Sequence, residues 1–320
     1  MKVLFNGSDT CLTGVTDFNL RETLECGQCF NFVRTDDSTD SSFCAYRIIA
    51  GGRVLFISEK SCDENKRNEI KTETCDLTLY DTDIEDYESF WKHYFDLDTD
   101  YLLIKKKIVE ECPELESIIR ENPGIRLLNQ QFFETLISFI ISQNKQIPQI
   151  KAVVRNLSEL AGKRIDCKKA AEKSIDETIN DDYHVYLFPT VDEMRRLTEY
   201  DIRSCKAGFR APYIMDAVNR VASGEISASC FDTLTTDEAR VKLMTIKGVG
   251  EKVANCVLLF SLGRREAFPV DVWMKRIMEE LYFHKDTDKK LIERFACEKF
   301  GQYAGYAQQY LFIYGRNTLK

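Results

Sequence analysis

The feature that most restricts the fold of this chain is a pair of helical patterns joined by a short glycine turn. The first pattern begins with the capping box Thr235-Thr236-Asp237-Glu238, in which the threonine bonds forward and the glutamate bonds back, and it continues to about Ile246. The second runs from about Glu251 to Leu262. Lys247-Gly248-Val249-Gly250 joins them, and its glycines permit the positive φ angles that a tight hairpin requires. We therefore predict a helix-hairpin-helix within residues 236–276.

Such a hairpin is suited to binding phosphate groups. Amides exposed at the start of a helix donate to an anion, and the positive end of the helix dipole attracts it. Gly248, Val249 and Gly250 are therefore predicted to contact the nucleic-acid backbone. The alternative is an ordinary turn between two helices, which is sufficient to explain these glycines when they are considered alone.

A lysine and an aspartate near the turn favour the functional interpretation. Lys252 lies in the first turn of the second helix, where the positive helix end favours a neutral amine, and such an amine can attack a sugar carbon to form a Schiff base. Asp271 follows nineteen residues later and is a candidate N-cap of the next helix. A carboxylate fixed in this way would stabilise a positively charged transition state. When each residue is considered alone, Lys252 could be a solvated surface lysine and Asp271 a purely structural cap.

The charge distribution favours contact with DNA on one face of the molecule. The formal net charge of −8 argues against a protein that coats nucleic acid nonspecifically. Between residues 241 and 276, however, basic residues outnumber acidic ones, with Lys242, Lys247, Lys252, Arg264, Arg265, Lys275 and Arg276 against Glu251, Glu266 and Asp271. A basic segment on an acidic chain suits binding to a short stretch of duplex.

The cysteines and the apolar runs indicate an intracellular enzyme without a metal. The first residues hold too short an apolar run for a signal peptide, and no segment approaches the roughly 18 apolar residues of a membrane span. We expect reduced thiols and a cytoplasmic protein, associated with the nucleoid if the source is a prokaryote. Cys26 and Cys29 have metal-site spacing, but zinc would need a second ligand pair. No cofactor is expected, although carbonyls near Met244, Ile246 and Val249 could hold a monovalent cation.

The fold class is predicted as α+β. Runs of β-forming residues at 46–49 and 54–57 flank Gly51-Gly52 and predict a hairpin, and residues 75–80 alternate as in a half-buried strand. From Pro113 onward helical periodicity dominates, with a central buried helix expected over 130–141. We predict an N-terminal antiparallel β domain (1–112), with a helix around 84–94, and an all-helical domain (113–320) interrupted by a charged surface insertion at 163–183.

At several landmarks the chain resembles the 8-oxoguanine DNA glycosylase/AP lyase family of the helix-hairpin-helix glycosylase superfamily. The similar segments occur in the same order as in the family and extend over nearly the whole chain. They are Leu24–Phe30, Tyr94–Asp98, Ser142–Asn144, Gly208–Ala211, the hairpin and Tyr303–Gln308. It implies a monomeric enzyme that acts on double-stranded DNA containing 8-oxoguanine and not on membranes. It also implies that Lys252 attacks C1′, that Asp271 is its essential partner, and that β-elimination follows.

The resemblance further implies how the damaged base is recognised. The backbone carbonyl of Gly27 would accept the N7 proton of 8-oxoguanine, and guanine, with a lone pair there, would lose about 1–3 kcal/mol. Phe312 and Cys256 would enclose the extruded base, and Gln308 would bond its Watson–Crick edge. Core packing is the alternative for Phe312 and Cys256.

On the side of the opposite base the chain departs from the family pattern. Asn144, Phe209 and Arg210 match the positions that fill the hole in the duplex and read cytosine, with Phe209 in place of a tyrosine. Gln149 stands where many members have a second cytosine-contacting arginine, which weakens the case for strict selection of cytosine. Trp273 stands where many members have a phosphate-contacting histidine.

Two other interpretations stay open. An endonuclease-III-like glycosylase for other oxidised bases would share the lysine and the aspartate, but only Cys297 follows Cys256, too few cysteines for the iron–sulfur cluster of many members. Alkylbase glycosylases lack the lysine. A noncatalytic helix-hairpin-helix DNA-binding protein would show no lysine-dependent trapping.

Overall fold

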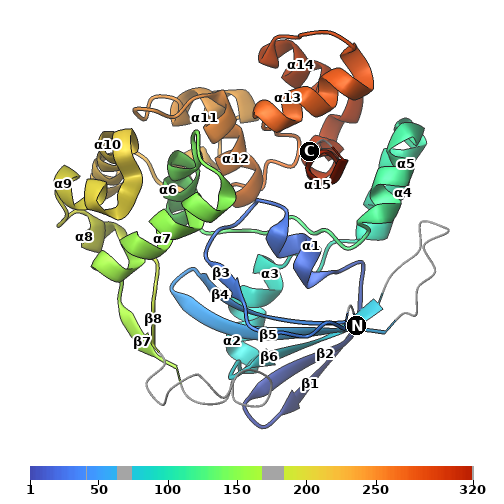
Figure 1. The fold of residues 1–320 in the computed structure, drawn as a ribbon, viewed down its shortest axis with the longest axis horizontal. Coiled ribbons are helices and arrows are strands. Elements are labelled where there is room, and N and C mark those ends of the chain that lie inside the picture. Colours follow the sequence, from blue (N-terminus) through green and yellow to red (C-terminus); the bar gives the residue numbers. More distant parts are fainter. Residues whose placement is uncertain (41, 63–73, 168–183, 319–320) are drawn as a thin grey trace.

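The computed structural model describes residues 1–40, 42–62, 74–167 and 184–318. Its first part is a six-stranded antiparallel sheet (Figure 1). The strands are β1 (Lys2–Asn6), β2 (Asp9–Thr16), β3 (Phe32–Arg34), β4 (Phe43–Ala50), β5 (Arg53–Ser61) and β6 (Thr74–Tyr80). They lie side by side in the order β1-β2-β6-β5-β4-β3. The predicted hairpin through Gly51-Gly52 is confirmed, since Ala50 pairs with Arg53 across it.

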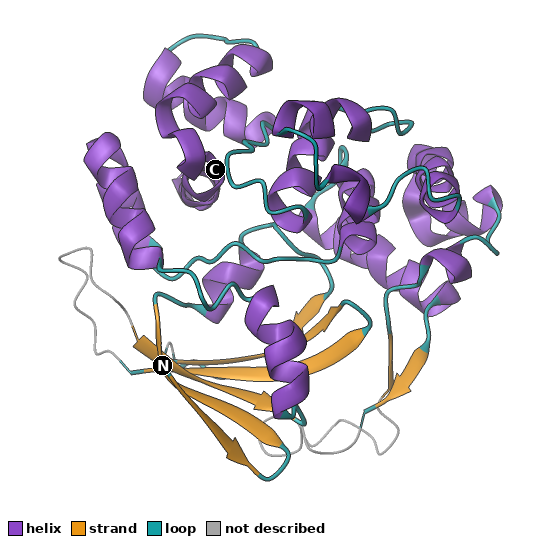
Figure 2. Ribbon diagram, turned by 180° about the vertical axis from the view of Figure 1, so that it is seen from behind, coloured by secondary structure: helices purple, strands orange, loops and turns teal. Residues whose placement is uncertain are grey.

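A helical segment covers one face of this sheet, as Figure 2 shows. It consists of α2 (Ile84–Asp86), a π turn (Tyr87–Trp91) and α3 (Lys92–Tyr94), in agreement with the helix predicted around 84–94. Its aromatic side chains pack with those of the sheet in the core of this part, and the Trp91 ring stacks on that of Phe95, just after α3, with the centroids 6.0 Å apart.

The rest of the described chain is mainly helical, and the predicted α+β class is confirmed. The helices are α1 (Leu20–Glu25), α4 (Tyr101–Glu111), α5 (Glu116–Glu121), α6 (Phe132–Ser142), α7 (Ile147–Ala161), α8 (Val191–Met194), α9 (Glu199–Ile202), α10 (Ala211–Ala222), α11 (Thr236–Leu243), α12 (Glu251–Ser261), α13 (Val272–Met278), α14 (Lys289–Phe300) and α15 (Ala304–Thr318). Short 3₁₀ or π turns lie at Pro113–Leu115, Arg203–Ala207, Gly208–Arg210, Ala228–Phe231, Glu279–Phe283 and Gly301–Tyr303. Helix α4 lies before residue 112 but contributes buried residues to the core of the helical part. The domain boundary predicted at residue 112 therefore stays a prediction.

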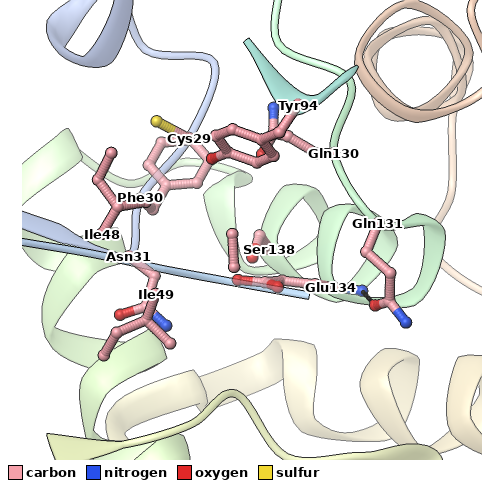
Figure 3. A pocket seen from close by; sticks show the side chains of 11 residues that line it. Cys29, Phe30, Asn31, Ile48, Ile49, Tyr94, Gln130, Gln131, Glu134 and Ser138 are labelled. Carbon is pink, nitrogen blue, oxygen red and sulfur yellow. Dashed lines mark hydrogen bonds between the residues drawn. The ribbon is translucent and has the colours of Figure 1, made fainter. Parts of the chain in front are cut away.

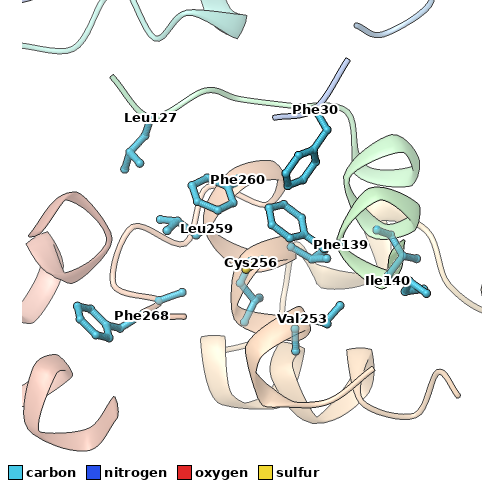
Figure 4. Close-up of a cluster of buried hydrophobic side chains, with 14 of the residues drawn as sticks. Phe30, Leu127, Phe139, Ile140, Val253, Cys256, Leu259, Phe260 and Phe268 are labelled. Carbon is cyan, nitrogen blue, oxygen red and sulfur yellow. The ribbon is translucent and has the colours of Figure 1, made fainter. Parts of the chain in front are cut away.

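Helix α6 is the buried centre of the helical part, as its nearly continuous apolar sequence predicts. All of its residues are buried except Glu134 and Ser142, which are half-buried. It packs against α12, where the Phe139 and Phe260 rings stack at 5.5 Å and 14° (Figure 4). The Gln130 amide, before α6, bonds to the Phe260 carbonyl near the end of α12. The two helices therefore run in opposite directions, and the C-terminal end of α6 meets the start of α12.

Buried charged side chains tie the sheet to the helices. Lys105 of α4 is fully buried and donates to Asp17 Oδ1 at 2.6 Å, just beyond the end of β2. Arg126 donates to the carbonyl oxygens of Thr16 (2.7 Å), Asp17 (3.0 Å) and Asp96 (2.6 Å). These bonds make the extended segment that precedes α6 a rigid connection.

A small hairpin projects from the helical part toward the sheet. Strands β7 (Arg164–Asp166) and β8 (His184–Tyr186) pair with each other, and Val185 and Leu187 pack against Ile49 of β4. Residues 168–183 of the predicted charged insertion lie outside the described residues. None of the helices within the described ranges is both long and apolar enough to span a membrane.

Candidate active site

Helix α11 begins with the predicted capping box, and the turn between α11 and α12 has one left-handed glycine. Thr235 and Glu238 exchange backbone and side-chain hydrogen bonds at 2.8 and 3.3 Å, as the capping box requires. Gly248 has a φ of +79°, and a Cβ there would lie 2.3 Å from the Tyr213 ring. The expectation of a positive φ at Gly250 was wrong. This residue is the N-cap of α12, and its φ of −100° is ordinary extended backbone.

The residues of this turn are not equally available to a phosphate. The Val249 amide donates to the Ile246 carbonyl at 3.0 Å, and the Val249 side chain is buried. Gly250 has nothing within 4 Å of its Cβ position and opens the first turn of α12. A phosphate at this turn would therefore meet Gly250 and the first amides of α12 rather than Val249.

Lys252, the predicted nucleophile, lies at the meeting point of α6 and α12. Its side chain is half-buried, and Nζ lies 3.1 Å from the Ser142 hydroxyl at the end of α6. That hydroxyl donates to the Phe139 carbonyl at 2.8 Å, so a lone pair faces the lysine. Nζ also lies 5.0 Å from the centre of the Phe139 ring. The amine is thus in contact with a serine and an aromatic ring, and it also hydrogen-bonds the Cys256 thiol. The sequence did not reveal the contact with Ser142.

Asp271 lies close to the same group without touching the lysine. It is the N-cap of α13, as predicted, with Oδ1 accepting from the Met274 amide at 2.7 Å. Across the described residues no ion pair within 4 Å joins it to Lys252. Both charges act on the thiol of Cys256, whose pKa burial raises to about 11, while Lys252 lowers it and Asp271 raises it further. Lys252 and Asp271 are therefore both near enough to Cys256 to act on its thiol.

The residues expected to recognise the base come from both ends of the chain. Gly27 has a φ of +81°, and a Cβ there would lie 3.1 Å from the Phe312 ring, so the loop and α15 are in close contact. Gln308 precedes Phe312 by one helical turn and is 5% exposed. Its Oε1 is buried and has no hydrogen-bond partner. A buried acceptor without a donor costs about 1–3 kcal/mol, which points to a ligand that supplies one.

On the opposite-base side, Phe209 is exposed and Arg210 is buried. Phe209 is 49% exposed, as a wedge into a duplex would need to be. The Arg210 guanidinium donates to the carbonyl oxygens of Gln143 and Ala207, and it lies 4.2 Å from the centre of the Phe209 ring. Its donors are therefore bonded to the main chain in this structure.

The other residues of this group are on the surface. Asn144 is exposed and has a φ of +50° directly after the end of α6. Gln149 is exposed, and its Oε1 accepts from the Gln146 amide at 3.2 Å as part of a cap on α7. Trp273 is 42% exposed in the first turn of α13, with the Arg276 guanidinium 5.4 Å from its ring. The roles proposed for them stay predictions.

A separate polar pocket lies between residues 29–31, strand β4 and helix α6 (Figure 3). Glu134 of α6 points into it, and burial raises the pKa of this carboxyl from 4.5 to about 7. Its Oε2 accepts from the Gly51 amide at 3.2 Å. Lys252, Asp271 and Gln308 do not line this pocket. In the part of the chain that is described, no group of three or more His, Cys, Asp or Glu residues is placed to hold a metal ion.

Two family models match the chain in succession. The model described as "8-oxoguanine DNA glycosylase, N-terminal domain" matches residues 11–136. The model described as "HhH-GPD superfamily base excision DNA repair protein" matches residues 137–302. The matched ranges therefore include most of the sheet (nearly all of β2, and β3 to β6), the hairpin and both residues of the proposed catalytic pair.

Solved structures and a curated relative are similar to the chain over most of its length. MBOgg1, solved in complex with a low-affinity DNA ligand, is 39% identical with a TM-score of 0.86, and the match covers 100% of this chain and 99% of that one. The 8-oxoguanine glycosylase/lyase of Clostridium acetobutylicum, solved with double-stranded DNA containing cytosine opposite 8-oxoguanine, is 36% identical with the same TM-score and coverage. The protein named "Probable N-glycosylase/DNA lyase" of Methanothermobacter thermautotrophicus is 28% identical, over 90% of this chain and 94% of its own length.

Proposed function

The chain belongs to the 8-oxoguanine DNA glycosylase family, and from that premise we propose that it removes 8-oxoguanine from double-stranded DNA and then cleaves the strand as an AP lyase. It is a DNA repair enzyme of the helix-hairpin-helix class with both N-glycosylase and lyase activity. The endonuclease-III-like and noncatalytic alternatives do not account for relatives of this kind over the full length of the chain.

Lys252 is the nucleophile of this proposal. The lone pair of its amine attacks C1′ of the damaged nucleotide, and the electrons of the N-glycosidic bond leave with the base. The attached nitrogen gives one proton to the departing base, and the sugar ring opens to a protonated imine as O4′ takes a proton from water. Loss of a C2′ proton then expels the 3′ phosphate, and water releases the lysine. The Asp271 carboxylate, fixed by its bond to the Met274 amide, stabilises the positive charge that develops on the sugar.

The observation that carries the choice of base is the unpaired oxygen of Gln308. The Watson–Crick edge of guanine and of 8-oxoguanine presents two adjacent donors, N1–H and N2–H, whereas that of adenine presents one donor, N6–H, beside the N1 acceptor. A buried amide oxygen is complementary to donors, so occupancy by a guanine-type base removes the cost of leaving it unpaired. The Gly27 carbonyl then distinguishes 8-oxoguanine from guanine, because only the oxidised base carries a proton on N7 that this carbonyl can accept.

The DNA partner is a duplex that the hairpin, Asn144, Phe209 and Arg210 contact together. Phe209 fills the space that the extruded nucleotide leaves, and Arg210 reads the orphaned base after exchanging its hydrogen bonds to the Gln143 and Ala207 carbonyls. Trp273 packs against the backbone rather than donating to a phosphate as a histidine would. The enzyme acts as a monomer in the cytoplasm, and a monovalent cation at the hairpin carbonyls is compatible with the chemistry but takes no part in it.

Borohydride trapping on defined duplexes tests the proposal. The wild-type enzyme should form a covalent adduct on duplexes with 8-oxoguanine and none on unmodified guanine. Lys252→Gln should bind the same duplex with unchanged affinity and form no adduct, while Lys289→Gln, which removes an exposed lysine of α14, should trap normally. Equal trapping on guanine would defeat the proposed base discrimination.

A further inference from the structure

Three buried side chains, Cys26, Gln28 and Gln309, lie directly behind the residues proposed to read the base. Gln28 follows Gly27 in the chain, and Gln309 follows Gln308 in α15. The three residues are 1%, 0% and 2% exposed, respectively. Buried amides need hydrogen-bond partners, so the bonds of these side chains show what they hold in place.

Gln28 fastens the recognition loop to the segment that precedes α6. Its Nε2 donates to the carbonyl oxygens of Thr23 (2.7 Å) and Arg126 (2.8 Å). Its Oε1 accepts from the Leu128 amide at 2.9 Å, and its backbone carbonyl accepts from the Gln130 side chain at 2.7 Å. Arg126 is itself bonded to four main-chain carbonyls at the end of β2 and after α3. The loop is therefore anchored to a rigid part of the molecule on one side.

The Cys26 thiol connects the same loop to α15. Burial raises the pKa of this thiol to about 12, so it keeps its proton at neutral pH. The S–H group donates to the Thr23 carbonyl at 3.1 Å. The sulfur lone pairs remain free to accept, and the Gln309 Nε2 donates to them at 3.1 Å, with the Gln28 amide 3.2 Å away. One sulfur atom thus links the two segments that carry Gly27 and Gln308, although 283 residues separate Cys26 from Gln309 in the chain.

This link bears on recognition because the two base readers approach different edges of one flat molecule. In the proposed complex the Gly27 carbonyl meets N7–H and the Gln308 amide meets the Watson–Crick edge. The distance between these edges is fixed by the base, so both hydrogen bonds form only if the protein fixes the separation of its two readers to within about 0.5 Å. A loop that moved freely relative to α15 would accept guanine by shifting its carbonyl away from the N7 lone pair.

We propose that Gln28 and Gln309, joined through the Cys26 thiol, are positioning residues that set the separation between the Gly27 carbonyl and the Gln308 amide. The inference rests on the proposed function and extends it to residues that touch neither the base nor the sugar. Abasic DNA offers no base to read. Cleavage of abasic DNA therefore needs Lys252 and Asp271 but not the alignment of Gly27 with Gln308.

The test compares two substrates under single-turnover conditions: a duplex with 8-oxoguanine opposite cytosine and the same duplex with a preformed abasic site. Gln309→Leu keeps the size of the side chain and removes the donor. Excision of 8-oxoguanine should fall about tenfold, as expected for one lost hydrogen bond, while cleavage at the abasic site should stay within about twofold. Cys26→Ala should behave in the same way. Gln302→Leu, the same exchange at an exposed position outside the link, should leave both rates unchanged.

A double variant separates a linked unit from two independent contributions. If Cys26 and Gln309 act through one contact, Cys26→Ala/Gln309→Leu should lose no more excision than either single variant. Parallel losses on both substrates would assign these residues to general stability and overturn the inference, as would unchanged excision. A wild-type enzyme that cleaves abasic DNA but leaves 8-oxoguanine in place would instead contradict the proposed function itself.

Discussion

The Lys252 amine lies 3.1 Å from the Ser142 hydroxyl, at the point where the end of α6 meets the start of α12. The hydroxyl hydrogen is directed to the Phe139 carbonyl, so the oxygen can only accept from the lysine. Ser142 therefore holds the amine in one place before the substrate arrives. The distance between the nucleophile and C1′ depends on this contact, since effective attack requires near-contact geometry.

Replacement of Ser142 should slow formation of the covalent adduct without weakening DNA binding. Threonine and valine have nearly the same shape and differ in the hydroxyl, so they isolate this hydrogen bond. Ser142→Val should reduce the single-turnover trapping rate about tenfold, and Ser142→Thr should stay within about threefold of the wild type. The measurement is borohydride trapping with saturating enzyme, beside the dissociation constant of the duplex. A valine variant as fast as the threonine variant would show that the hydroxyl has no part in placing the lysine.

Gln149→Arg should sharpen the preference for cytosine opposite the lesion. Gln149 is exposed and its amide caps α7, so a longer side chain at this position has room to reach the duplex. A bidentate guanidinium contact discriminates between bases by about 1–3 kcal/mol. Excision rates with each of the four opposite bases measure the effect.

Gln149→Lys is the control for that experiment, because lysine adds the same charge without the planar fork. It should tighten binding to all four duplexes alike. An arginine variant that also raises all four rates by one factor would contradict the assignment of this position to base reading.

Gly248→Ala should destabilise the protein, whereas Gly250→Ala should not. A methyl group at residue 248 would enter a left-handed backbone and lie 2.3 Å from the Tyr213 ring, but the Cβ position of residue 250 is open. We expect Gly248→Ala to lower the free energy of unfolding by about 2–4 kcal/mol and Gly250→Ala to change it by less than about 0.5 kcal/mol. Equilibrium urea unfolding distinguishes them. Similar losses in both variants would be inconsistent with the extended backbone found at Gly250.

Glu134→Gln should make the stability of the protein less dependent on pH. Burial raises the pKa of the Glu134 carboxyl from 4.5 to about 7 in the folded protein, so the folded state holds this proton more tightly than the unfolded chain. The free energy of unfolding therefore falls as pH rises from about 4.5 through about 7, and this loss is complete above that range. Glutamine keeps an oxygen for the Gly51 amide but carries no charge.

The free energies of unfolding of the glutamine variant and the wild type should accordingly be nearly equal at pH 4.5. At pH 8 the variant should be more stable than the wild type by about 1–3 kcal/mol. Urea unfolding at both pH values provides the comparison. A difference that is constant across this range would rule out titration of Glu134 as its cause.

Local patterns in the sequence predicted the local structure well. The capping box at Thr235, the hairpin at Gly51-Gly52 and the N-cap at Asp271 are each formed by neighbouring residues, and all three are present. The identity of a glycine did not reveal its backbone angle. Gly248 and Gly250 looked alike in the sequence, yet only the first packs against a ring that excludes a side chain.

Contacts between distant segments were beyond the reach of the sequence. Ser142 and Lys252 are 110 residues apart, and Cys26 and Gln309 are 283 residues apart. Each pair depends on how helices pack, which no periodicity encodes. The burial of Arg210 against main-chain carbonyls was missed for the same reason, since its family role implied a side chain free to reach DNA.

The enclosed thiol at Cys26 has a consequence for an enzyme that works on oxidised DNA. Peroxides attack thiolates. The Cys26 thiol is 1% exposed and its pKa is about 12, so almost no thiolate forms at neutral pH and peroxides have little access to it. The atom that joins the two halves of the base site is thus resistant to the reagents that create the lesion. The contact between Cys26 and Gln309 should therefore persist during the oxidative stress in which repair is most needed.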